Sequence, residues 1–119
     1  MRHNVAHKKF NRTTNQRKAL LIGLCNQIIQ KGRIITTLPK AKAVRPMVER
    51  LVTYGRNEVS LHRFRVLMAT LRSKSSCEKI VSQWGPKYKE RPGGYLRIIK
   101  AGFRKGDAAP MALIEFVEA

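Results

Sequence analysis

The chain is poor in acidic residues, and the first of them comes late. Its 119 residues contain 7 Asp and Glu against 25 Lys and Arg, which gives a formal net charge of +18. No acid precedes Glu49, so residues 1–48 carry basic charge without any compensation. A solvated surface normally mixes the two signs of charge. The imbalance therefore indicates a polyanionic partner that relieves the self-repulsion of the protein.

Residues that build catalytic or metal sites are equally scarce. Cys25 and Cys77 have neither a CxxC spacing nor a histidine cluster, so we expect reduced thiols and no zinc site, with Cys25 buried in a helix. His62 stands alone, and no HExxH, GxSxG or Walker-type sequence is present. Because the acids are scattered rather than paired, we expect no enzymatic activity, no cofactor and no small-molecule substrate.

Long apolar runs are absent as well. No segment reaches the roughly 18 consecutive apolar residues of a membrane span, and the basic start lacks the apolar stretch of a signal peptide. We therefore expect a cytoplasmic protein without a membrane partner. With 43% hydrophobic residues, the chain can still build one modest core. We predict a single α+β domain over residues 13–119, preceded by a basic N-terminal arm over residues 1–12 that orders on a partner.

The first predicted helix has the clearest pattern in the sequence. Thr13 to Gln16 fit a capping box, and two apolar rows at i, i+4 spacing follow it. Gly32 predicts the end of this helix, with Lys31 in the last turn. Residues 33–38 are rich in β-branched side chains and predict a short strand.

Three further helices are predicted after this strand. Pro39 fits the first position of the first of them, but Pro46 in its interior predicts a kink near residues 42–45 or a helix that begins later. The other two are shorter. Ser60 is predicted to cap one of them, and Ser75 to Glu78 form a capping box for the other.

The last of these helices is predicted to end at Gly85 and Pro86. Trp84 stands at helical spacing with its apolar neighbours, so core packing is favoured over base stacking for its ring. Tyr88 is placed in the basic loop KYKERPGG together with Arg91, where an exposed ring could stack on a base.

Two strands are predicted at the end of the chain, over residues 95–100 and 111–117. The residues between them exceed what a hairpin turn needs, so we predict a finger, residues 101–110, that enters a folded nucleic acid. Phe103 is expected either to fix the root of this finger against the domain or to stack on a nucleotide base. The element order predicts a two-layer domain with a small mixed three-stranded sheet and helices on one face.

Basic side chains that can neutralise phosphates are grouped in four segments. They are Arg2, His3, Lys8, Lys9 and Arg12 in the arm, Arg17 and Lys18 at the first helix, Lys40, Lys42 and Arg45 at the strand-to-helix corner, and Arg97, Lys100, Arg104 and Lys105 in the hairpin. An irregular RNA suits a basic arm combined with a basic loop. Two alternatives stay open: a DNA-binding nucleoid protein, although no recognition helix stands out, and a cationic membrane binder, although no amphipathic basic helix is evident.

The sequence resembles the bacterial large-subunit ribosomal protein seventeen family over nearly its whole length. The resemblance is carried by MRH at the start, NRTTNQRKAL over 11–20, TTLPKAK over 36–42 and GGYLRIIKAGFRKGDAAPMALIE over 93–115. It implies a fold of one helix, one strand, three helices and two strands. It also implies a structural constituent of the large ribosomal subunit that binds and stabilises 23S rRNA near the peptide exit tunnel, beside other ribosomal proteins.

The same resemblance implies roles for individual residues. It adds Thr36 and Tyr95 to the RNA-facing or scaffold set and gives geometric roles to Gly93, Gly94, Gly102 and Gly106. For Asp107 we favour a turn residue that accepts hydrogen bonds from backbone N–H groups over contact with a partner. Pro46 departs from what we expect within a helix of this family.

Overall fold

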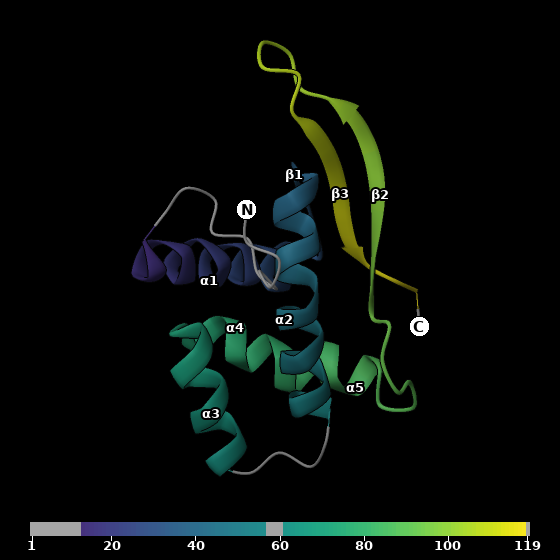
Figure 1. Ribbon diagram of the computed structural model, residues 1–119. Coiled ribbons are helices and arrows are strands. Elements are labelled where there is room, and N and C mark those ends of the chain that lie inside the picture. Colours follow the sequence, from purple (N-terminus) through teal and green to yellow (C-terminus); the bar gives the residue numbers. More distant parts are fainter. Residues whose placement is uncertain (1–12, 57–60, 119) are drawn as a thin grey trace, which may run out of the picture.

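The computed structural model of the chain describes residues 13–56 and 61–118, so the predicted arm and the predicted Ser60 cap lie outside the described residues. The elements follow the predicted order of helix, strand, helices and two strands (Figure 1). They are α1 (Thr14–Lys31), β1 (Arg33–Thr37), α2 (Leu38–Arg56), α3 (Leu61–Leu71), α4 (Lys74–Lys79), the π-helical segment η1 (Ile80–Trp84), α5 (Gly85–Lys87), β2 (Leu96–Phe103) and β3 (Pro110–Phe116). Within these ranges no helix has both the length and the hydropathy that a membrane crossing requires.

Helix α1 forms as its sequence predicts. The Thr13 side chain accepts a hydrogen bond from the Gln16 backbone N–H, and the Thr13 N–H donates to the Gln16 side chain, which completes the capping box. Gly32 ends the helix in the left-handed region at φ 83° and donates its N–H to the Ile28 carbonyl at 2.7 Å. Cys25 lies on the buried side of this helix, as expected.

The sheet has the order β1-β3-β2, and both of its strand pairs are antiparallel, so the predicted mixed sheet is wrong. β3 is the central strand because the helices between β1 and β2 return the chain to the far edge of the sheet. Ile34 and Ile114 face each other on the buried side, whereas Ile35 and Ile99 are exposed on the opposite side. The helices therefore cover one face of the sheet, which confirms the two-layer α+β class.

Helix α2 runs without interruption from Leu38 to Arg56 and includes Pro46. A start later than Pro39 is therefore wrong, since the helix begins one residue before it. An interior proline costs about 3 kcal/mol. Val44 and Val48, on either side of Pro46, are fully buried, and burying two such side chains contributes a comparable amount in the opposite direction.

The last helical stretch differs from the prediction at both of its ends. Ser73, not Ser75, is the N-cap of α4, because its side chain accepts from the Ser76 N–H. The stretch also continues past Gly85 through η1 into α5. Pro86 follows the π-helical turn η1, in which the Gly85 N–H donates to the Ile80 carbonyl, and the stretch ends at Lys87, one residue after this proline.

Trp84 lies in the core, as its spacing predicted. The side chain is buried, and its Nε1–H donates to the Ile29 carbonyl at 2.8 Å. The ring stacks on Phe116 of β3 with ring centroids 3.9 Å apart. Trp84 therefore connects the end of α1 with the sheet through one side chain.

Helix α2 crosses the η1 and α5 segments at a pair of glycines. A Cβ atom at Gly55 would lie 2.3 Å from Cγ2 of Ile80, and one at Gly85 would lie 2.6 Å from the Gly55 carbonyl oxygen. We expect Gly55→Ala to lower the free energy of unfolding by about 1–3 kcal/mol, because the core has no room for the added methyl group.

Urea unfolding measures this effect, and Gly23→Ala is the matched control. A Cβ atom at Gly23 meets nothing within 4 Å, so alanine there should raise stability by about 0.5–1 kcal/mol through its higher helix propensity. A Gly55→Ala variant as stable as wild type would show that the two segments are not in close contact.

Candidate nucleic-acid interface

The finger is built mostly as a continuation of its strands rather than as a long loop. β2 extends to Phe103, which pairs with Pro110 at the start of β3, so the irregular part covers only residues 104–109. The strand pairing shifts between Lys100 and Phe103, where Gly102 has φ 82°. A glycine at such a bulge lets the strand bend without breaking the hairpin. Figure 1 shows the finger projecting beyond the helices and beyond β1.

The tip of the finger is closed by Arg104 and Asp107. Their side chains form two hydrogen bonds, Nε to Oδ1 at 3.1 Å and Nη2 to Oδ2 at 2.5 Å. Oδ1 also accepts from the Ala109 N–H at 3.2 Å. The hydrogen bond to Arg104 is the largest cause that lowers the pKa of Asp107 to about 2, and the hydrogen bond from the Ala109 N–H is the next. These contacts are consistent with the prediction of Asp107 as a turn residue, and they partly compensate the Arg104 charge.

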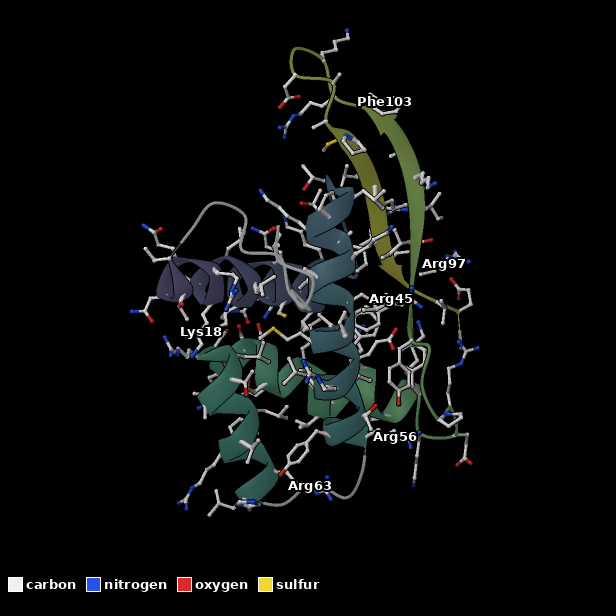
Figure 2. All side chains as sticks on the ribbon, viewed as in Figure 1. Lys18, Arg45, Arg56, Arg63, Arg97 and Phe103 are labelled. Atoms are coloured by element: carbon white, nitrogen blue, oxygen red, sulfur yellow. The ribbon has the colours of Figure 1, made fainter. Side chains whose placement is uncertain are left out.

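Phe103, Lys100 and Lys105 are exposed on the hairpin and open to a partner. The Phe103 side chain is 75% exposed and lies at the end of β2, so it does not pin the base of the finger (Figure 2). Neither lysine has an acidic partner among the described residues. An exposed aromatic face beside two cations can stack on a base while the cations contact phosphates.

Arg97 and Arg45 differ from these lysines because each has an acidic partner. Arg97 pairs with Glu115 across the sheet at 2.7 Å, and Arg45 pairs with Glu49 along α2 at 3.2 Å. Exposed ion pairs of this kind contribute only about 0–1 kcal/mol. A phosphate can therefore compete for either arginine, but the sequence alone did not indicate that their charges are compensated.

The rings of two residues predicted to face RNA are buried, so the expected exposure of Tyr88 is wrong, and Tyr95 takes the scaffold position that was its alternative. Tyr88 is 1% exposed, and its hydroxyl donates to the Val117 carbonyl at 2.5 Å. Tyr95 is fully buried, with its ring 5.1 Å from that of Tyr88 and its hydroxyl hydrogen-bonded to Thr53. Tyr88 is buried because the helical stretch continues past Gly85 and places it one turn after Trp84.

The loop after α5 is held by contacts within the protein. Arg91, also predicted to contact RNA, donates to the Gly94 carbonyl at 3.1 Å, and its own carbonyl accepts from Arg56. The glycines given geometric roles all have positive φ; they are Gly93, Gly94, Gly102 and Gly106. That part of the prediction is consistent with the backbone.

Three other predicted cations form a second region away from the finger, and Lys40 is not among its lining residues. Arg17, Lys18 and Lys42 line a groove between α1, α2 and α3, and two residues that were not predicted, Arg50 and Arg72, line it with them. Arg50 could have been found from its spacing, because it lies two turns after Lys42 on α2. In Figure 2, Lys18 lies on the side of α1 that faces α3.

The described residues also bear on metal-binding and thiol chemistry. No group of three or more His, Cys, Asp or Glu that could hold a metal ion occurs over residues 13–56 and 61–118. Burial raises the pKa of Cys25 to about 12 and also raises that of Cys77. Both thiols therefore stay protonated and unreactive near neutral pH.

Comparison with known proteins gives a consistent result. The model of the family described as "Ribosomal protein L17" matches residues 20–117. A protein of Methylocella silvestris named "Large ribosomal subunit protein bL17" is 49% identical over 118 residues, which cover 99% of this chain and 82% of the relative. A protein of the same name from Ehrlichia canis is 47% identical over 121 residues, which cover 99% of this chain and 92% of the relative.

The pairing of Asp107 with Arg104 predicts a specific pH dependence of the finger. A carboxylate with a lowered pKa stabilises the tip above its ordinary pKa of 3.8, and this stabilisation is lost as the pH falls toward 2. In NMR spectra the Ala109 amide should titrate with a midpoint of about pH 2. Asp107→Asn should abolish that transition, while the Ile114 amide in the sheet reports whether the fold persists. A midpoint near 3.8 would contradict the pairing.

Proposed function

The chain belongs to the ribosomal protein L17 family, and we propose that it is a structural constituent of the large ribosomal subunit that binds 23S rRNA. Its role is to stabilise the folded rRNA near the peptide exit tunnel, beside neighbouring large-subunit proteins, and so to support translation in the cytoplasm. The work is non-catalytic. It consists of neutralising phosphates and holding RNA segments together.

The projecting finger is the observation that supports RNA binding most directly. Strand pairing up to Phe103 and Pro110 makes the hairpin rigid, so little conformational entropy is lost when it enters a partner. Its exposed surface carries Lys100, Phe103 and Lys105 without a free acid, because Asp107 is engaged by Arg104. A rigid basic hairpin with an exposed ring suits the clefts of a folded RNA.

The other proposed contacts surround the body of the protein. They are Arg2, His3, Lys8, Lys9 and Arg12 of the arm, Arg17 and Lys18 of α1, Lys40, Lys42 and Arg45 of α2, and Arg97 and Arg104 of the hairpin. Because these cations come from segments distant in sequence, the RNA is proposed to surround the domain formed by residues 13–119 rather than to touch one side.

Sedimentation of a cell lysate tests this proposal. We expect the chain to sediment with large ribosomal subunits in a sucrose gradient and to stay with them after a wash in high salt, because many simultaneous contacts hold it there. A chain that sediments in a light fraction or with DNA would overturn the proposal.

The finger makes a narrower prediction for RNA affinity. Lys105→Glu should weaken binding to large-subunit rRNA and reduce the slope of log affinity against log salt by about one, since each phosphate contact releases roughly one counterion. Lys74→Glu is the matched control. Lys74 is exposed in the first turn of α4, where glutamate is tolerated, and it lies outside the proposed contacts. Equal effects of the two reversals would mean that only net charge matters.

A further inference from the structure

The groove between α1, α2 and α3 has the features of a binding site rather than of a surface irregularity. Its volume is about 700 Å³, within the range of roughly 300–1,000 Å³ typical of ligand pockets. Its apolar lining comes from Leu21, Ile22, Pro39, Ala43, Pro46, Met47 and Ala69. The five basic residues of its lining are Arg17, Lys18, Lys42, Arg50 and Arg72, and no lining residue is acidic.

The cations of this groove are left for a ligand. None of the five pairs with an acid in the described part of the chain, whereas Arg45, on the same helix but outside the groove, is paired with Glu49. Five like charges around one depression repel one another in the free protein. An anion that enters the groove would remove this repulsion.

Pro46 leaves one backbone carbonyl of α2 without its regular helical donor. In a regular helix the N–H at position 46 would donate to the Lys42 carbonyl, and proline has no N–H. The Lys42 carbonyl therefore lacks its helical donor at a point where both residues line the groove. Such a carbonyl can accept from a ribose hydroxyl or from an exocyclic amine of a base.

Arg72 is held in the groove by an unusual backbone conformation. It follows the end of α3 with φ 56°, in the left-handed region that non-glycine residues rarely adopt, and its N–H donates to the Met68 carbonyl at 2.8 Å. Glycine is the residue usually found at this position of a helix end. An arginine that adopts this conformation and lines a basic groove suggests that its side chain is required there.

We propose that this groove binds a single nucleotide unstacked from the RNA, with its base on the apolar lining of Pro46 and Met47 and its phosphates on the basic residues. This rests on the proposed function. A polyanion with apolar base faces satisfies both parts of the lining, whereas an apolar peptide would leave the five crowded charges of the groove without partners. The structure thus assigns to α2 a base-binding role distinct from the finger.

A substitution that fills the groove distinguishes binding in the groove from general attraction of an anion to the basic protein. Ala43→Trp would occupy the groove without removing a cation, and Ala19→Trp makes the same change at an exposed position of α1 outside it. Both full-length variants and wild type are titrated with adenosine 5′-monophosphate and with ribose 5-phosphate, followed by NMR of the Met47 and Thr70 amides. Wild type and Ala19→Trp should bind the nucleotide about tenfold more tightly than the sugar phosphate, and Ala43→Trp should lose this preference.

A second variant, Arg72→Gly, tests the groove without a substitution that could prevent folding. Arg72→Gly removes one cation and relieves the left-handed backbone, so nucleotide affinity should fall by about tenfold while thermal stability does not fall. Equal binding of nucleotide and sugar phosphate by wild type would overturn the proposal, because the groove would then hold phosphate alone.

Cross-linking on intact large subunits that contain this chain tests whether the bound nucleotide belongs to the rRNA. With 4-thiouridine in the rRNA, irradiation at long wavelength should cross-link RNA to a peptide containing Met47 or Leu21. A cross-link confined to the finger, or a neighbouring protein attached to these peptides instead, would overturn the RNA assignment. Absence of the chain from large subunits would contradict the proposed function, while the titrations would still decide whether the groove binds a base.

Discussion

The contact of Trp84 with Phe116 joins the helical layer to the sheet, and the other features depend on this junction. The Trp84 indole N–H donates to the Ile29 carbonyl near the end of α1, and Gly32, which ends that helix in the left-handed region at φ 83°, lies beside the Trp84 ring. The Phe116 N–H in turn donates to the Gly32 carbonyl. The end of α1 and the central strand therefore meet at one point, and the hairpin that carries the finger projects from it.

This junction explains how a strongly basic chain can hold a rigid projection. Over residues 13–56 and 61–118, the largest fully buried side chains are apolar or tyrosine, so the described cations remain outside the core. Four ion pairs occur within the described ranges, and all involve at least partly exposed side chains. Such pairs contribute little to stability. The fold is thus held by apolar burial, and most of its positive charge stays available to an anionic partner.

The two basic regions suit different features of an RNA. The finger presents charge and one exposed ring at the end of a narrow hairpin, which can enter a cleft (Figure 2). The groove is concave, with apolar surface inside and charge around it, which suits a base that has left its stack. Neither region has to fold when it binds RNA, because both are carried by regular helices and strands, so little conformational entropy is lost.

Local patterns predicted much of the fold and part of the interface. The capping box at Thr13, the glycine end at Gly32 and the core position of Trp84 were predictable because each depends on neighbours within a few residues. Tyr88 was not, because its burial depends on a helix that continues through η1, and Pro86 locally resembles a stop. The strand order was likewise beyond the sequence, since it depends on the path of the five helical segments between β1 and β2.

The sequence by itself determined the class of partner, because net charge is a sum over residues and does not depend on where they lie. It also determined the family, through runs long enough to be specific. Only the tertiary structure decided which cations act together. Arg17 lies on α1, Lys42 on α2 and Arg72 directly after α3, and their common groove exists only because the packing of those helices brings them to one place.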